Sequence, residues 1–493
     1  MNSENIPYME EPFFKPTQRA FPAEALPEVV FAEKPNWEHF YKEAWRIAWK
    51  HVYESNAIHV SPYMGEGCGV NRVWIWDTCF MVNFCRYAFK QYPGIQSIDN
   101  FYKIFYENNT TDIKVHHPDN PPLFAWAEYL YFQMSGDLDR IHFVLEEKQY
   151  LQRHYLWLES IKERDFCPPF AACLVKWKAC DKGYQWSGCP SGMDNTPRGR
   201  GDYNSIYWVD ALAQQAMSAL YIIKLAESIG NQEIADQFKE EYAKKKKMLQ
   251  YYWDPETGFF FDRYIANGEF CRVVTPASYW VMMAEAASPE QAKQMGKMLL
   301  DPDKLGGKFP IPTIAHDDPD FVANGEYWKG SIWLPTSYMT IKALEKYGEF
   351  ELAQDLTGKL LDHMETTYRD FTPHTIWECY CPVDYMPAKK NSRNEWVRKD
   401  FCGWSALGPI SLFIENIVGV HDVSAKDHRI SWRVTHTCRH GIKKLKIGDD
   451  TVSIIYENGK ISAEATSDYT LIVNGKEYQI QKGNTDVCLS MNA

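Results

Sequence analysis

Two short segments, about 180 residues apart, each place one carboxylate among turn-forming or aromatic residues. Residues 191–199 read Ser-Gly-Met-Asp-Asn-Thr-Pro-Arg-Gly, and residues 375–380 read Thr-Ile-Trp-Glu-Cys-Tyr. Two carboxyl groups that meet in an aromatic pocket can act as an acid and a base, which is what the cleavage of a glycosidic bond requires. Asp194 and Glu378 are therefore the first candidates for catalytic residues.

Each of these carboxylates also has a plain structural interpretation. An Asp in a Met-Asp-Asn-Thr-Pro turn can simply accept hydrogen bonds from its own backbone. Arg198, four residues after Asp194, could hold a substrate hydroxyl or orient a carboxylate. Glu378 lies between Trp377 and Tyr380. A Glu buried among aromatic rings has a raised pKa unless partners support its ionised form.

Residues 74–77 read Trp-Ile-Trp-Asp at the start of a predicted helix. Trp74 and Trp76 could stack on the apolar face of a sugar ring while Asp77 accepts hydrogen bonds from its hydroxyls. Asp77 could equally be the N-cap of that helix. Taken alone, Asp77 is more readily explained as a cap.

Residues 326–333 place Trp328 and Trp333 on either side of Gly330. A glycine lets a ligand approach the backbone closely, although the same residues could form a tightly packed aromatic turn. Trp404 follows in the string Asp-Phe-Cys-Gly-Trp-Ser and adds a further aromatic surface. These segments predict a pocket in which aromatic rings surround the two carboxylates.

The composition limits the classes of partner. The chain has 493 residues with a net charge of −12, and 15% of them are aromatic, including 18 Trp. The negative charge argues against nucleic acid and against anionic membranes. No run of about 18 apolar residues predicts a transmembrane helix. Carbohydrate is the expected partner, and the oligomeric state stays open.

The sequence predicts no metal and no cofactor. The 13 Cys include no C-x-x-C pair, and no H-E-x-x-H motif occurs. The adjacent His116 and His117 could be ligands, but no companion residue at a metal-binding spacing supports them. Mostly buried thiols and the absence of a visible signal peptide predict a cytoplasmic location. A periplasmic location would follow if a signal had been removed.

The elements that must position these residues are mainly helical. Apolar residues recur at helical spacing in about twelve segments from 37–52 to 404–418, one of them a single long helix over 138–162. Twelve helices suit six hairpins in a double ring, so we expect a mainly α fold with an (α/α)6 barrel over residues 36–420. Periodicity alone does not distinguish this ring from another large helical array.

The two ends of the chain differ from its middle. Residues 1–35 are rich in Pro and are expected to form an extended arm on the surface. Residues 421–493 alternate short β-branched segments with turn pairs such as Asn-Gly, which predicts a small antiparallel β module. Such a module could bind carbohydrate, but packing against the barrel is the favoured interpretation.

Four groups of residues, in order along the chain, resemble glycoside hydrolase family 63 and, more distantly, the family 37 trehalases. The matching segments are residues 74–77, 191–198, 327–333, and 377–378 with 403–405. The resemblance implies an (α/α)6 barrel and an inverting α-glycosidase without a metal or redox cofactor. It also implies that Asp194 is the general acid and Glu378 the general base.

The resemblance also implies which residues line the subsite for the cleaved sugar. The predicted substrate-binding residues are Trp74, Trp76, Asp77, Arg198, Trp328, Gly330, Trp333, Trp377 and Trp404. The large N-terminal β domain of the eukaryotic processing glucosidases has no counterpart here, which favours small α-glucosides or α-mannosides as substrates. The basic residues Lys389, Lys390 and Arg393 could favour an acidic aglycone such as glycerate.

Two alternatives have other chemistry. A sugar epimerase or a polysaccharide lyase on the same scaffold typically relies on His or Tyr, and neither carboxylate would then be essential. A non-catalytic sugar-binding protein would not need both carboxylates, yet both are present. Release of a free reducing sugar separates a hydrolase from these alternatives.

Overall fold

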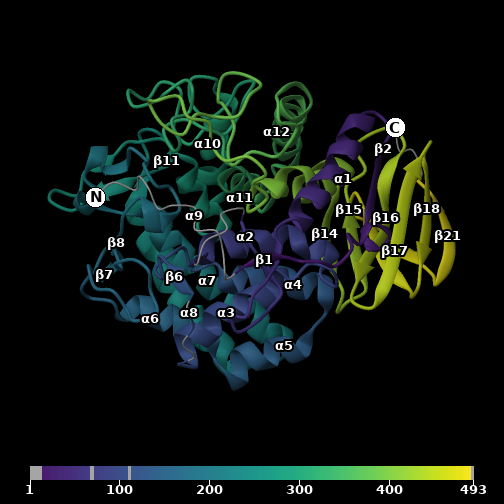
Figure 1. The fold of residues 1–493 in the computed structure, drawn as a ribbon, viewed down its shortest axis with the longest axis horizontal. Helices are drawn as coiled ribbons and strands as arrows, with labels where there is room; N and C mark the ends of the chain where they lie inside the picture. Colours follow the sequence, from purple (N-terminus) through teal and green to yellow (C-terminus); the bar gives the residue numbers. More distant parts are fainter. Residues whose placement is uncertain (1–13, 67–71, 109–110, 112, 490–493) are drawn as a thin grey trace.

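A computed structural model describes residues 14–66, 72–108, 111 and 113–489. Helices dominate the regular structure from Pro35 to Val418, and the strands that follow the last helix gather on one flank (Figure 1). Residues 1–13 of the predicted N-terminal arm lie outside the described residues.

Within the described part of the chain, six helices are largely buried and form a closed ring. Each helix contacts the next in chain order, and the last contacts the first. Every side chain of the first is buried, which matches its lack of a polar face. The six are α2 (Ile75–Cys85), α4 (Phe124–Ser135), α7 (Val209–Ser228), α9 (Trp280–Met283), α11 (Leu334–Glu345) and the π-helical η10 (Gly408–Val418).

A second set of helices is buried along one face only, as expected for an outer layer. These are α1 (Pro35–Trp49), α3 (Gly94–Tyr106), α6 (Tyr150–Ser160), α8 (Gln232–Leu249), α10 (Pro289–Leu300) and α12 (Phe350–Asp370). No helix among the described residues combines the length and the apolar character needed to cross a membrane.

The single helix expected over 138–162 is wrong, because the chain breaks there. It forms α5 (Leu138–His142), a π-helical turn η3 (Phe143–Glu147) and then α6. Gln149, before α6, has a φ of 54°. An α-helix cannot pass through this left-handed conformation, so the change of direction falls at that residue.

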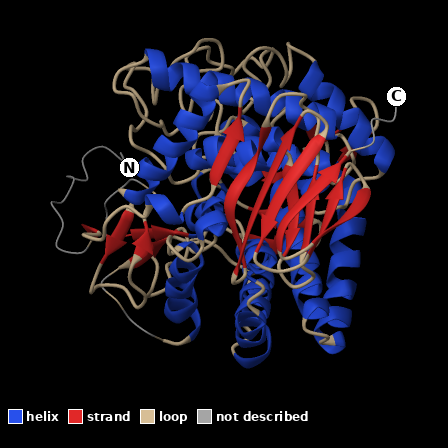
Figure 2. Ribbon diagram, turned by 90° about the vertical axis from the view of Figure 1, so that its right-hand side faces the viewer, coloured by secondary structure: helices blue, strands red, loops and turns tan. Residues whose placement is uncertain are grey.

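The C-terminal strands form two sheets (Figure 2). One has the order β14-β15-β19-β20 and the other β2-β16-β17-β18-β21. The expected antiparallel pairing holds except for β15 and β19, which are parallel. The strands are β14 (Val420–Ser424), β15 (Arg429–Trp432), β16 (His440–Ile447), β17 (Asp450–Glu457), β18 (Lys460–Ala465), β19 (Tyr469–Val473), β20 (Lys476–Ile480) and β21 (Gly483–Cys488).

One strand of the second sheet comes from the other end of the chain. β2 (Glu28–Phe31) pairs antiparallel with β16, in register from Phe31 opposite His440 to Glu28 opposite Lys443. The ring of Phe31 also packs edge-on against Phe413 of η10, at 6.0 Å between centroids. The N-terminal segment therefore joins the sheet to the helical ring, which its Pro-rich composition did not predict.

Short strands occur before the first helix and in the connections between helices, where they hold loops in fixed positions. They are β1 (Lys15–Pro16), β3 (Val52–Glu54), β4 (Tyr63–Met64), β5 (Arg72–Trp74), β6 (Lys114–His116), β7 (Lys178–Cys180), β8 (Gly183–Gln185), β9 (Ile206–Tyr207), β10 (Trp253–Asp254), β11 (Phe259–Phe260), β12 (Asp262–Tyr264) and β13 (Phe270–Cys271).

Candidate active site

The predicted site residues gather around the N-terminal ends of the ring helices. A Trp precedes the first turn in four places: Trp74 before α2, Trp208 before α7, Trp333 before α11 and Trp404 before η9 (Ser405–Leu407). The N-terminus of a helix carries partial positive charge, which favours carboxylates nearby. The connections that enter these helices carry both candidate catalytic residues.

The backbone of Glu378 is fixed on both sides. Its N–H donates to the carbonyl of Arg398 at 3.0 Å, and Tyr380, two residues later, exchanges backbone hydrogen bonds with Ile332. The carbonyl of Glu378 accepts from the indole Nε1 of Trp404 at 3.0 Å. Glu378 therefore sits in a short extended segment held between two other connections.

The side chain of Glu378 is fully buried and meets donors at both oxygens. Oε1 accepts from the hydroxyl of Tyr327 at 2.9 Å, and Oε2 accepts from the backbone N–H of Arg398 at 3.1 Å. The guanidinium Nη1 of Arg398 lies 3.5 Å from Oε1. These contacts suit a carboxylate that accepts a proton from water.

The loop of Asp194 is attached to the segment that carries Tyr327. The side chain of Asn195 accepts from the backbone N–H of Trp328 at 2.7 Å and donates to the carbonyl of Glu326 at 3.0 Å. Because Tyr327 lies between these two residues and donates to the other carboxylate, a single segment connects both candidate residues. The structure thus brings together the two loops that the sequence singled out.

The electrostatics of Asp194 suit an acid. Burial raises the pKa of Asp194 to about 7, and the charge of Glu378 also raises it, while Arg398 lowers it. At neutral pH a large fraction of Asp194 is therefore protonated and able to donate.

Asp77 lies in the first turn of α2 and is not its N-cap, because that position belongs to Trp74. Burial raises the pKa of Asp77 well above its ordinary value, and the charge of Glu66 and a hydrogen bond with it act in the same direction. Its Oδ1 atom is buried and has no hydrogen-bond partner among the described residues. Such an oxygen is available to a substrate hydroxyl.

Aromatic rings supply the predicted apolar surfaces. Trp328 stacks on Trp333 at 4.0 Å between centroids, and Trp333 lies 5.4 Å from Trp404. Trp76 and Trp377 are buried, and their indole N–H groups have no hydrogen-bond partner within the described ranges. Unpaired buried donors beside large rings are what a polyhydroxylated ligand can satisfy.

The substrate-binding role predicted for Arg198 is wrong. Arg198 is completely buried and donates to both carboxylate oxygens of Asp210 and both of Asp262, at 2.6–2.8 Å. Its guanidinium also lies 4.2 Å from the ring of Trp208. Four hydrogen bonds occupy the guanidinium fork, so Arg198 orients two carboxylates and holds its loop in place.

The close approach at Gly330 involves protein atoms. Gly330 has a φ of 140°, and a Cβ there would lie 2.9 Å from the ring of Phe321 and 3.0 Å from the carbonyl oxygen of Val322. The backbone conformation and this contact both require glycine. Packing of the loop against its neighbours therefore explains the glycine, and the predicted ligand approach stays a prediction.

Comparison with known protein families decides the assignment. Residues 105–394, more than half of the chain, match the family model described as the mannosylglycerate hydrolase MGH1-like glycoside hydrolase domain. The chain belongs to this family. It is accordingly a glycoside hydrolase, and its substrates are carbohydrates.

Relatives of this glycoside hydrolase cover different parts of it. An uncharacterized protein of Borreliella burgdorferi is 26% identical over 84% of this chain and 86% of its own length. A probable mannosyl-oligosaccharide glucosidase of Schizosaccharomyces pombe is 22% identical, and the chain spans only 36% of its length. The mannosylglycerate hydrolase of Thermus thermophilus is 27% identical over 32% of this chain and 36% of its own.

Solved structures show the same fold. A GH63 mannosylglycerate hydrolase of Thermus thermophilus, solved in complex with glucose, covers 75% of this chain and 99% of its own, with a TM-score of 0.56 and 16% identity. The neutral trehalase Nth1 of Saccharomyces cerevisiae has a TM-score of 0.54 at 15% identity and covers 71% of this chain and 73% of its own. These neighbours place the chain among the six-hairpin helical folds.

Three residues of the site were not predicted from the sequence. Tyr327 lies inside a segment that was singled out only for its Trp residues. Arg398 follows a basic stretch in which only Lys389, Lys390 and Arg393 were predicted to contact an acidic aglycone. Glu66 lies among glycines and had no signal, but its side chain is 7% exposed and lies 3.8 Å from the guanidinium of Arg398.

One group of side chains could hold a metal ion. Ligand atoms of His116, His117 and Cys173 all lie within 4.8 Å of one another. The sequence showed no companion for the two His because Cys173 is 56 residues further along. Burial lowers the pKa of His116 to about 2 and that of His117 to about 4.

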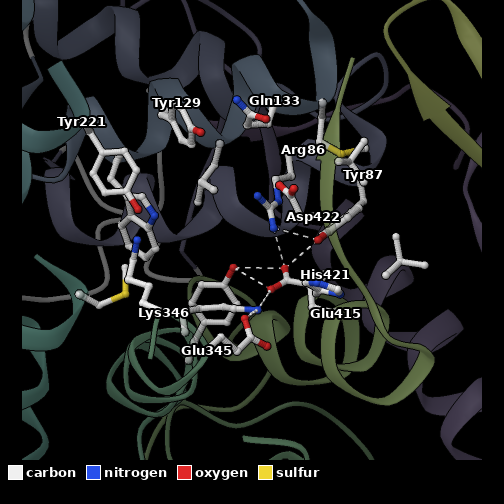
Figure 3. A pocket seen from close by; sticks show the side chains of 18 of the residues that line it. Arg86, Tyr87, Tyr129, Gln133, Tyr221, Glu345, Lys346, Glu415, His421 and Asp422 are labelled. Atoms are coloured by element: carbon white, nitrogen blue, oxygen red, sulfur yellow. Dashed lines mark hydrogen bonds and ion pairs between the residues drawn. The ribbon is translucent and has the colours of Figure 1, made fainter. Parts of the chain in front are cut away.

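A cavity of about 290 Å3 lies at the opposite, C-terminal ends of the ring helices (Figure 3). Its contacts converge on Glu415, which accepts from Arg86 and Tyr87 at 2.7 Å, from Lys342 at 2.6 Å and from Tyr338 at 3.2 Å. Burial acts to raise the pKa of Glu415, but the charges of Lys342 and Arg86 outweigh it and lower the pKa below its ordinary value. This C-terminal pole of the helical ring contains an ion-pair network centred on Glu415, in which the Nε of Arg86 has no hydrogen-bond partner among the described residues.

Proposed function

We propose that this glycoside hydrolase is an inverting α-glycosidase built on an (α/α)6 barrel with a C-terminal β module. Its substrates are small α-mannosides or α-glucosides. The observation that carries the proposal is the contrast between two linked carboxyl groups: Asp194, whose pKa is raised to about 7, and Glu378, which meets donors at both oxygens. An acid and a base with such different surroundings are what inversion requires.

In the proposed reaction Asp194 donates its proton to the glycosidic oxygen. A water molecule attacks the anomeric carbon from the opposite face and transfers a proton to Glu378. The bond between the anomeric carbon and the glycosidic oxygen breaks, and the products are the aglycone alcohol and a β-configured sugar. The mechanism needs roughly 6.5–9.5 Å between the two carboxyl groups so that the water fits.

The proposed subsite for the cleaved sugar combines Trp76, Asp77 and Trp377. Each contributes a buried polar atom without a protein partner in the described part of the chain. Hydroxyls of a hexose can pair with these atoms while the stacked Trp328 and Trp333 form an apolar wall. Gluco- and manno-configured rings both offer hydroxyls and an apolar face for such contacts.

An acidic aglycone is supported by Arg398 more than by the basic residues first considered. The Nζ of Lys389 lies 2.9 Å from the ring centroid of Trp396 and donates to the carbonyl of Asn394. Arg398 instead lies beside Glu378 and is partly exposed. The relative named a mannosylglycerate hydrolase makes glycerate the acidic aglycone to test first.

Proton NMR of fresh reactions tests the mechanism. The wild type would be mixed with α-mannosides and α-glucosides, including mannosylglycerate, beside Asp194→Asn and Glu378→Gln. Asp181→Asn, an exposed acid in a hairpin, serves as the matched control. We expect the β-anomer to appear first with the wild type and the control only. Initial release of the α-anomer would rule out inversion.

A further inference from the structure

The backbone around β6 places a cysteine beside two histidines. β5 and β6 pair in parallel, and the chain at residues 170–172 adds to them. The N–H of Val115 donates to the carbonyl of Phe170 at 3.0 Å, and the N–H of Ala172 donates to the carbonyl of Val115 at 2.8 Å. Cys173 follows directly, so its position relative to β6 is set by backbone hydrogen bonds.

The two His side chains lie on the same side of the chain. Consecutive side chains of a strand point to opposite faces, but His117 has a φ of 51° and interrupts this alternation. The ring centroids of His116 and His117 are consequently only 4.2 Å apart. The Sγ of Cys173 lies 3.3 Å from Nδ1 of His116, and the buried Nδ1 of His117 has no partner among the described residues.

We propose that His116, His117 and Cys173 form a binding site for a borderline-soft divalent cation such as Zn2+. Two imidazoles and a thiolate are the ligands that this ion prefers, and three protein ligands leave a fourth position for water. As the bond between the metal and sulfur forms, the S–H bond of Cys173 breaks and its proton goes to solvent. The partial exposure of Cys173 gives the ion a path from solvent.

The site adjoins the candidate active site through Trp74. The ring of His116 packs edge-on against Trp74 at 5.0 Å between centroids. A bound ion fixes His116 against Trp74 and therefore inhibits hydrolysis. This inhibition rests on the proposed function, whereas the binding does not.

Arg72 should weaken the binding of the ion, so its removal should change the metal affinity in the opposite direction to the removal of Cys173. Its Nη1 lies 3.4 Å from Nδ1 of His116, so its positive charge repels a cation and competes for the imidazole. Arg72→Ala should therefore tighten binding, while Cys173→Ser should weaken it by about tenfold or more through loss of the thiolate ligand. A site of this kind is the simplest reason for the two substitutions to act in opposite directions.

Titration with Co2+ measures binding without reference to activity, because a thiolate bound to Co2+ absorbs by charge transfer. We expect one equivalent to produce this band in the full-length wild type, and the band to be lost in Cys173→Ser. Cys438→Ser, a partly exposed thiol in the β module, should retain it. An equal band in Cys173→Ser, or no band in the wild type, would overturn the site.

Zn2+ should lower kcat/KM of the wild type, EDTA should restore it, and Cys173→Ser should resist the inhibition. If Co2+ binds as expected but saturating Zn2+ leaves kcat/KM unchanged, the proposed inhibition is wrong and the proposed metal site is retained. If neither the wild type nor any variant hydrolyses a substrate, the proposed function fails while the absorption titration still decides the metal site. The two proposals can thus fail separately.

Discussion

The two poles of the helical ring treat carboxyl groups in opposite ways. At the N-terminal pole, burial and the charge of Glu378 raise the pKa of Asp194 to about 7, and one cation, Arg398, opposes them. At the C-terminal pole, Glu415 is buried, and two cations and two phenols donate to it, so that its pKa is lowered (Figure 3). Burial is the largest single influence on both groups, and the number of partners decides the direction.

This difference separates chemistry from stability. A buried carboxylate with a full set of donors holds its proton poorly and binds its neighbours, as an ion-pair network does. A buried carboxyl group with few donors keeps its proton to higher pH, as a general acid must. The proposed functional pole is thus the one where fewer cations oppose the effect of burial on the carboxyl group, and this contrast can be tested residue by residue.

The largest effect is expected from the proposed catalytic pair. Asp194→Asn and Glu378→Gln should each lower kcat by about 10²- to 10⁴-fold, since general acid–base groups contribute rate factors of that size. Initial rates with purified variants measure this change, and circular dichroism verifies the fold. A variant of either residue with near-normal kcat would remove that residue from the proposed mechanism.

The next effect should appear in stability alone. Glu415→Gln removes a charge that Arg86 and Lys342 share. Lys342 keeps its ion pair with Glu345, but Arg86 loses its ion pair with Glu415, and leaving a buried cation unpaired costs about 3–5 kcal/mol. We expect a clearly lower thermal unfolding midpoint, with kcat per folded molecule unchanged at low temperature. Glu457→Gln, an exposed acid, should change stability by less than about 0.5 kcal/mol. A selective loss of kcat in Glu415→Gln would contradict the separation of the poles.

A smaller effect is expected in the pH dependence of kcat/KM, which reports the raised pKa of Asp194. Asp194 must be protonated to act, so kcat/KM should fall as pH rises through about 7. Because the positive charge of Arg398 lowers the pKa of Asp194, Arg398→Met should move this limb to higher pH while also reducing kcat. The exposed Arg19→Met should leave the profile in place. A limb that stays fixed or moves downward in Arg398→Met would exclude Asp194 as its origin.

The smallest effect concerns the hydroxyl on Glu378. Tyr327→Phe removes one hydrogen bond of 2.9 Å to a charged group, a contact worth about 1.5–3 kcal/mol at most. We expect kcat to fall by about tenfold, with little change in unfolding midpoint. Tyr203→Phe, which loses contacts with backbone carbonyls of the Asp194 loop, is the comparison. A larger loss of kcat in Tyr203→Phe than in Tyr327→Phe would mean that the position of the Asp194 loop matters more than the hydrogen bond to Glu378.

Local patterns predicted much of this molecule. Helical spacing of apolar residues located most helices, since each ring helix must be apolar and each outer helix amphipathic. The carboxylates Asp194 and Glu378 stood out because loops with glycine and Trp are unusual, and the structure brings their loops together. These features depend on residues that are close in sequence.

Features that depend on distant partners were not predictable. Arg198 resembled a ligand residue because its partners Asp210 and Asp262 carry no sequence mark that pairs them with it. Cys173 reaches His116 only because backbone hydrogen bonds align two separate strands. The spacing of apolar residues cannot predict such contacts, because the partners are far apart in sequence although they are close in space.

The pairing of β2 with β16 joins segments about 410 residues apart. During synthesis β2 leaves the ribosome early, and it can pair with β16 only after nearly the whole chain has been made. A protease that trims the N-terminal segment would uncover the edge of β16, and an uncovered strand edge is a template for pairing with another molecule. Because β2 is the edge strand of its sheet, the N-terminal segment decides which strand edge the finished protein presents.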